Sequence, residues 1–256
     1  MTETLASGQI LLLIPLVALT AGAYASVGLG GGTGYLAIMT LVGMPATTMT
    51  STALLLNLVV TGAALIRFGL AGRLKVRLFL PFLIPAMPAA FLGGLITANQ
   101  KVFLVLLAAA LAIAGIAMLR NIPTSQEHNN GPDRIRLLAV AIPSGLIIGL
   151  LSGFLGIGGG VFLGPLILFL GWAGPKEVAA MNSALILALS AIALSAHGIR
   201  GAVQFSVVLP LAAAALIGGL AGATLSEKKL SARALQRIFA VIVLIAAAKA
   251  AYDAVS

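Results

Sequence analysis

Two glycine clusters are the residues in this chain with the clearest capacity for chemistry. They read Gly28-Leu-Gly-Gly-Gly32 and Gly156-Ile-Gly-Gly-Gly160, and each is followed by a short apolar run. A helix that begins inside a membrane presents unpaired N–H groups and a partial positive charge, which favour an anion. Glycine lets a ligand approach such a backbone closely. We predict an anion site formed by Gly30, Gly31, Gly32 and Thr33 together with Gly158, Gly159 and Gly160.

Tight helix packing is the alternative explanation for these glycines. Gly145, Gly149, Gly153 and Gly156 lead into the second cluster at three- and four-residue spacing, which is typical of packing glycines in membrane helices. Both interpretations stay open for any single glycine. A dinucleotide-binding loop is excluded, because the clusters lack strand alternation and a downstream acidic residue.

Hydroxyl and amide side chains gather just beyond each short run. Thr47-Thr-Met-Thr-Ser-Thr52 is followed by Asn57, and the second half of the chain has Met181-Asn-Ser183. These groups donate hydrogen bonds without charge, which suits sulfonate or carboxylate oxygens. The candidates are Ser51, Thr52, Asn57, Asn182 and Ser183. Helix capping and back-bonding to helix carbonyls are the alternative roles.

Acidic residues avoid the apolar runs. All of them lie in gaps or at chain ends: Glu3, Glu127, Asp133, Glu177, Glu227 and Asp253. Because a cation transporter normally carries a carboxylate within a span, the pattern favours an anion. With no cysteine and two histidines we expect no metal and no cofactor. The chain also lacks Gly-x-Ser-x-Gly and His-Glu-x-x-His, so we do not expect an enzyme.

The composition requires a membrane. Hydrophobic residues make up 61% of the chain and charged residues 8%, against about 25% charged in soluble domains. The net charge of +9 is spread over short gaps between apolar runs, as the positive-inside rule predicts, and not over one nucleic-acid-binding face. We predict a multi-pass all-α protein of the cell (inner) membrane, with the lipid bilayer as its solvent and no nucleic-acid partner.

An internal repeat organises the chain. Besides the glycine clusters, Thr52-Ala-Leu-Leu-Leu matches Ser183-Ala-Leu-Ile-Leu, Pro81 matches Pro210, and Gly93 matches Gly222. Internal duplication is a common way of building transporters. The only long hydrophilic stretch of the sequence separates the two halves and is typical of a linker. We predict a first membrane repeat at 1–120, a linker at 121–136 and a second membrane repeat at 137–256.

Each repeat contains five apolar runs, of which the second is too short to cross a bilayer. These runs, 33–43 and 160–171, are predicted to be half-helices that follow a break within the membrane, which leaves about eight apolar spans by hydropathy. The gap that holds most of the basic residues also differs between the two repeats. The gap 67–77 holds four basic residues and the gap 228–237 holds four, whereas their counterparts hold Arg200 and Lys101 alone. We therefore favour inverted repeats, with parallel repeats as the alternative.

The duplicated motifs resemble the sulfite exporter TauE/SafE family. The resemblance is carried by Gly28-Leu-Gly-Gly-Gly-Thr-Gly-Tyr-Leu, Gly156-Ile-Gly-Gly-Gly-Val-Phe-Leu-Gly-Pro-Leu, Asn182-Ser-Ala-Leu and His197-Gly-Ile-Arg-Gly201. It implies secondary transport of sulfite, organosulfonates or related small anions. The first membrane repeat departs from the pattern, because it has Phe68 where the second has His197. An anion channel and a non-transporting membrane subunit or sensor remain alternatives, and a homo-oligomer is left open.

Overall fold

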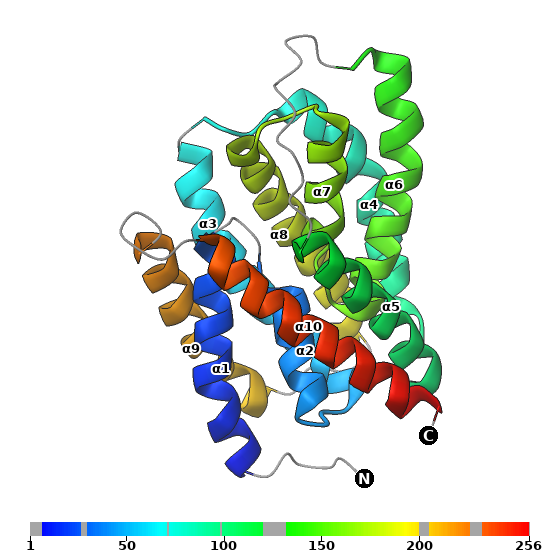
Figure 1. Cartoon of the computed structure of the whole chain (residues 1–256). Coiled ribbons are helices and arrows are strands. Elements are labelled where there is room, and N and C mark those ends of the chain that lie inside the picture. The colour runs from blue at the N-terminus through cyan, green and yellow to red at the C-terminus, as the bar shows by residue number, and fades with distance from the viewer. Residues whose placement is uncertain are drawn as a thin grey trace.

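The described part of the chain is entirely helical. The structure is a computed structural model, and it describes residues 7–26, 30–70, 72–97, 99–119, 132–199, 205–225 and 232–255. These residues form ten helices and no strand (Figure 1). In chain order the helices are α1 (Ser7–Ser26), α2 (Gly32–Leu41), α3 (Ala46–Leu70), α4 (Val76–Leu95), α5 (Gln100–Leu119), α6 (Arg134–Leu155), α7 (Gly160–Leu170), α8 (Pro175–Ile199), α9 (Phe205–Leu225) and α10 (Ala232–Val255).

The two short helices follow the glycine clusters, as the sequence predicts. Helix α2 has 10 residues and α7 has 11, so neither can cross a bilayer alone. Each begins after a glycine in the left-handed region, Gly31 at φ 89° and Gly159 at φ 80°. Because other residues rarely adopt this conformation, the glycines determine where the helices start. Gly171, at φ 68°, ends α7 in the same conformation.

Five of the described helices are long and apolar enough to cross a membrane. They are the spans at Thr48–Ile66, Val76–Leu95, Gln100–Leu119, Arg134–Leu155 and Pro175–Ile199. Shorter apolar segments occur at Leu11–Ala25 and Val207–Gly222 as well as in α2 and α7. The total of eight spans stays a prediction. Large apolar side chains are also exposed on the outer surface, such as Ile84, Ile147 and Ile217, each at least 60% accessible. Lipid solvates such a surface.

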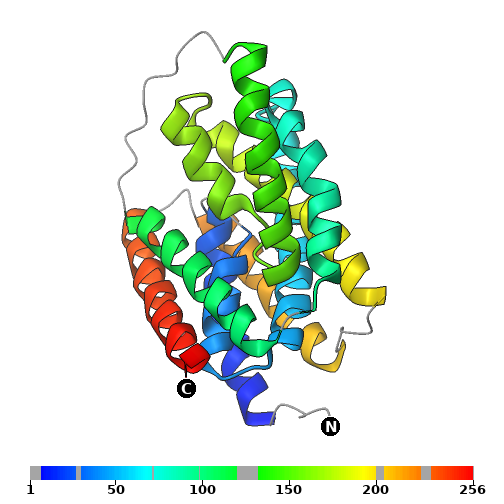
Figure 2. The ribbon, with the colours of Figure 1, turned by 90° about the vertical axis from the view of Figure 1, so that its right-hand side faces the viewer.

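Glycines bring helices from the two halves of the chain into backbone contact. Along α4 and α6, a Cβ on Gly149 would lie 2.2 Å from the carbonyl oxygen of Ala86, and one on Gly153 would lie 2.0 Å from that of Ala90. Along α1 and α9, a Cβ on Gly218 would lie 2.0 Å from the carbonyl oxygen of Ala18. Gly149 and Gly153 are therefore packing glycines, which is the alternative that their spacing raised. The views in Figures 1 and 2 both show α4 beside α6 and α5 beside α10.

The long helices α3 and α8 pack against each other and run in opposite directions. Lys75, which precedes α4, forms an ion pair of 2.8 Å with Glu177 in the first turn of α8. Near the other end of the pair, a Cβ on Gly94 of α4 would lie 2.8 Å from the Cβ of Ala196 of α8. Helices α4 and α8 are thus parallel. In Figure 1, α3 ends and α4 begins toward the same end of the molecule, so α3 runs opposite to α4 and is antiparallel to α8.

Candidate functional site

The two glycine clusters meet at the side chain of Asn57. Asn57 is the twelfth residue of the 25-residue helix α3 and is fully buried. Its Nδ2 atom donates a hydrogen bond of 3.4 Å to the Gly156 carbonyl, and the same atom would lie 2.8 Å from a Cβ on either Gly32 or Gly158. Its Oδ1 atom would lie 3.1 Å from a Cβ on Gly30. One carboxamide therefore lies between the starts of both short helices.

Ile186, midway along α8, also lies against both glycine clusters. It is the twelfth residue of that 25-residue helix and is buried. Its side chain would lie 2.9 Å from a Cβ on Gly30, 2.7 Å from one on Gly158 and 2.5 Å from one on Gly160. We call the place where α3 and α8 pack together at Asn57 and Ile186 the crossing. Its centre is polar on the α3 side, at Asn57, and apolar on the α8 side, at Ile186.

Close packing accounts for part of the glycine requirement. The space beside Gly30 is filled by the methyl group of Thr61, by Ile186 and by Asn57, and a Cβ on Gly32 would lie 2.3 Å from the Ile157 carbonyl oxygen. Gly158, at φ 84°, also needs the left-handed conformation. These contacts are compatible both with packing and with close approach of a ligand, so the geometry alone does not separate the two interpretations.

Several candidate hydroxyls already have hydrogen-bond partners, two within their own helix and one in a neighbouring helix. The Ser51 hydroxyl donates to the Thr48 carbonyl at 3.3 Å, and the Ser183 hydroxyl donates to the Ala179 carbonyl at 2.9 Å. The Thr33 Oγ1 atom lies 3.2 Å from the Tyr24 hydroxyl. Back-bonding, the alternative role for these residues, is therefore present at Ser51 and Ser183.

Other buried polar atoms have no hydrogen-bond partner among the described residues. They are Asn57 Oδ1, Thr52 Oγ1, Asn182 Oδ1, Tyr35 Oη, Ser152 Oγ and Ser190 Oγ. Buried polar groups nearly always have partners, and each exception needs an explanation such as a ligand or water. Three of the six belong to the predicted site residues. Asn57 Oδ1 and Tyr35 Oη, which lie beside the first glycine cluster, therefore have unused hydrogen-bonding capacity.

Tyr35 is a further candidate site residue, which the sequence interpretation did not single out. Its side chain is fully buried in α2 and covers the left-handed glycine at the start of that helix, since a Cβ on Gly31 would lie 2.7 Å from the Tyr35 ring and 2.8 Å from its hydroxyl. A buried tyrosine hydroxyl usually finds a partner. A tyrosine inside a half-helix was the available signal, because the chain contains only three tyrosines.

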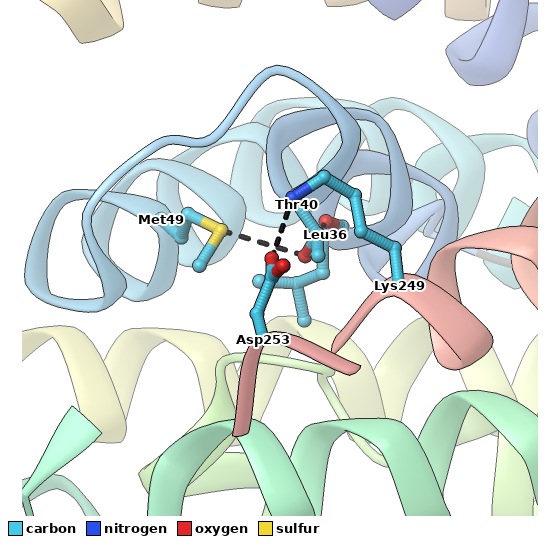
Figure 3. A network of polar contacts seen from close by, with 5 residues as sticks. All are labelled: Leu36, Thr40, Met49, Lys249 and Asp253. Carbon is cyan, nitrogen blue, oxygen red and sulfur yellow. Dashed lines mark hydrogen bonds and ion pairs between the residues drawn. The ribbon is translucent and has the colours of Figure 1, made fainter. Parts of the chain in front are cut away.

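Charged side chains lie at the helix ends. Asp133 caps α6 by accepting a hydrogen bond from the Arg136 backbone amide, and Asp253 pairs with Lys249 near the end of α10. Figure 3 shows this pair beside Thr40 of α2, whose hydroxyl donates to the Leu36 carbonyl and to the Met49 sulfur. Where Asn57 meets the glycine clusters, the contacting side chains are uncharged.

His197 is buried near the end of α8. Its Nε2 atom lies 3.1 Å from the carbonyl oxygen of Gly153, in the last turn of α6. The last carbonyls of a helix lack partners within that helix, so His197 acts as a capping residue for α6. The side chain of Phe68, its counterpart in the first half of the chain, lies outside the described residues.

Comparison with known proteins identifies relatives along nearly the whole chain. The sequence model of the family described as sulfite exporter TauE/SafE matches residues 13–250. A curated protein of Sinorhizobium fredii (strain NBRC 101917 / NGR234), named probable membrane transporter protein y4hK, is 34% identical over 234 residues, which cover 89% of this chain and 92% of that protein. Probable membrane transporter protein YunE of Bacillus subtilis (strain 168) is 26% identical over 183 residues, which cover 66% of each chain. No solved structure matches the chain.

Proposed function

Because this chain belongs to the sulfite exporter TauE/SafE family and is a membrane transporter, we propose that it carries a small anion across the cell membrane. The substrate class is a sulfur oxyanion or an organosulfonate, and the mechanism is secondary transport by alternating access. The observation that carries this proposal is the meeting of two helix starts at Asn57, midway along the longest helices.

The chemistry of the crossing favours an anion held by neutral donors. The first amides of α2 and α7 lack partners within their own helices and carry the positive ends of the helix dipoles. The side chains that lie against the cluster glycines there include Asn57, Thr61, Ile186 and Tyr35, and none of these has a charge to compete with that potential. An oxyanion between the helix starts would satisfy amide donors that are costly to leave unpaired in hydrocarbon.

Inverted repeats would provide the two alternating states. The repeats proposed are 1–120 and 137–256, joined by the linker 121–136. Two observations support the inversion: the matching helices α3 and α8 are antiparallel, and the basic residues change sides between the halves. Rocking one repeat against the other would open the central site to each face of the membrane in turn.

Uptake by purified protein in liposomes tests this function. We expect saturable uptake of sulfite or a sulfonate, with mutual competition between them, at rates far below those of a channel. Unsaturable flux would identify an anion channel, and the absence of flux with a broad panel of sulfur oxyanions, sulfonates and carboxylates would favour a subunit or sensor.

A pair of matched variants in α3 tests the location of the site. Thr52→Val removes a buried hydroxyl that has no partner among the described residues, whereas Thr50→Val removes one that is bonded to the Ala46 carbonyl at 3.1 Å. A hydrogen bond to a charged group contributes about 1.5–3 kcal/mol. Thr52→Val should therefore raise the KM for uptake about tenfold, and Thr50→Val should leave it unchanged. Equal KM values in the two variants would show that the Thr52 hydroxyl does not bind the anion.

A further inference from the structure

The orientation of the Asn57 carboxamide is determined by its one hydrogen bond. Nδ2 faces the Gly156 carbonyl, which can only accept, so the nitrogen must be on that side. Oδ1 is then on the side of Gly30, which directly precedes the N-cap Gly31 of α2, whereas Nδ2 also lies against Gly32. An amide oxygen only accepts hydrogen bonds. The structure therefore directs a buried acceptor at the backbone that leads into α2.

This acceptor has no donor of its own in the described structure. Asn57 is fully buried, and Oδ1 has no partner among the described residues. The second half of the chain repeats the situation: Asn182 is 3% exposed, its Oδ1 is also partnerless, and its Cβ would lie 3.4 Å from a Cβ on Gly160 of α7. In each half of the chain, a short helix thus starts beside a buried asparagine whose amide oxygen has no donor among the described residues.

A bare oxyanion would leave these oxygens unsatisfied. It accepts from the backbone amides but brings no hydrogen for Oδ1, and it places like partial charges near each other. We propose that the transported anion carries its own O–H or N–H donor, and that Asn57 Oδ1 accepts it while the start of α2 binds the anionic group. This inference rests on the proposed function and narrows its substrate class.

The proposal separates anions that are otherwise alike. Singly protonated oxyanions, and sulfonates that carry a hydroxyl or ammonium group close to the sulfonate, can bind both the amide donors of α2 and the acceptor Asn57 Oδ1. Alkyl sulfonates and fully deprotonated oxyanions cannot. Ile186, opposite Asn57, offers only apolar contact and so does not replace the missing hydrogen bond.

Two sulfonates of equal size test the inference on the intact protein in lipid nanodiscs. They are 2-hydroxyethanesulfonate and propane-1-sulfonate, in which a methyl group replaces the hydroxyl. Titration calorimetry should show that the wild type binds the hydroxyl compound about tenfold or more tightly, because a site built for a donor rejects the analogue that lacks it. Asn57→Leu keeps the shape of the side chain and should reduce that preference to within about threefold.

A control variant and an ion substitution complete the design. Asn99→Leu changes an exposed asparagine that caps α5 through the Val102 amide, and it should keep the wild-type preference. Each titration is repeated with sodium replaced by N-methylglucamine, since a bound sodium ion could also satisfy an amide oxygen. We expect the preference to be independent of sodium.

Equal wild-type affinity for the two sulfonates would overturn the inference and leave the proposed function intact. If Asn57→Leu still prefers the hydroxyl compound, another group accepts the hydrogen bond from the ligand hydroxyl. If binding requires sodium and shows no preference between the two sulfonates, Asn57 Oδ1 binds a sodium ion instead. Failure of both compounds to bind would refute the sulfonate class in the proposed function itself. The wild-type comparison needs no variant, so it decides the question even if Asn57→Leu does not fold.

Discussion

Replacing Gly31 by alanine should separate the ligand role of the first glycine cluster from simple backbone strain. Gly31 has φ 89° and precedes α2, and a Cβ there would lie 2.7 Å from the buried Tyr35 ring. The left-handed conformation costs an alanine about 1–2 kcal/mol. Crowding of a well-packed side chain adds about 1–3 kcal/mol. If the displaced Tyr35 contributes to binding the anion, Gly31→Ala should lower both the affinity for the anion and the stability of the protein.

Gly43→Ala is the matched control, because it carries the same strain without the crowding. Gly43 has φ 77°, and a Cβ there would have nothing within 4 Å. Both variants should lose about 1–2 kcal/mol of stability from the backbone, and the remaining difference between them measures the crowding at Tyr35.

Thermal unfolding in detergent and titration with the transported anion provide the two readouts. We expect Gly31→Ala to bind the anion about tenfold more weakly, which corresponds to about 1.4 kcal/mol, and Gly43→Ala to bind it as the wild type does. The reasoning is refuted if Gly31→Ala is destabilised but keeps wild-type affinity, since Gly31 would then be a packing residue only.

Three further predictions concern topology, packing and selectivity. Cysteines introduced at the exposed positions Arg73 and Arg237 of this cysteine-free chain should both be labelled from the cytoplasm; labelling from opposite sides would contradict the inverted arrangement. Gly149→Leu should lower the free energy of unfolding by about 3 kcal/mol or prevent folding, because the new side chain would clash with the backbone of α4. Gly198→Ala in α8 should be tolerated, because a Cβ there would have nothing within 4 Å, and size-exclusion profiles and melting temperatures compare the two variants. Divalent metal ions should not be transported, and saturable metal uptake that anions do not inhibit would refute anion selectivity.

The half-helices could be predicted from the sequence because their signals are local. A run too short to span, bounded by glycines, is visible without any knowledge of its neighbours, and α2 and α7 begin where the clusters end. The basic residues alone favour inverted repeats, and the antiparallel packing of α3 and α8 agrees with that prediction.

The partners of the site residues could not be predicted in the same way. Contact between Asn57 and the Gly156 carbonyl joins residues far apart in the sequence, and helical periodicity says nothing about such pairs. Ile186 looked like any other apolar residue of a long run. Ser183 and Thr52 looked equivalent, yet one hydroxyl bonds to its own helix and the other has no partner among the described residues. That difference depends on rotamers.

A structure with a bromine-substituted hydroxyalkyl sulfonate bound tests the central claim most directly. Anomalous scattering locates the bromine independently of the electron density for the protein. We predict one peak in contact with the start of α2 and the Asn57 carboxamide, and its loss in crystals of Asn57→Leu. A peak elsewhere in the bundle, from a sulfonate that the protein transports saturably, would contradict the assignment of the anion site.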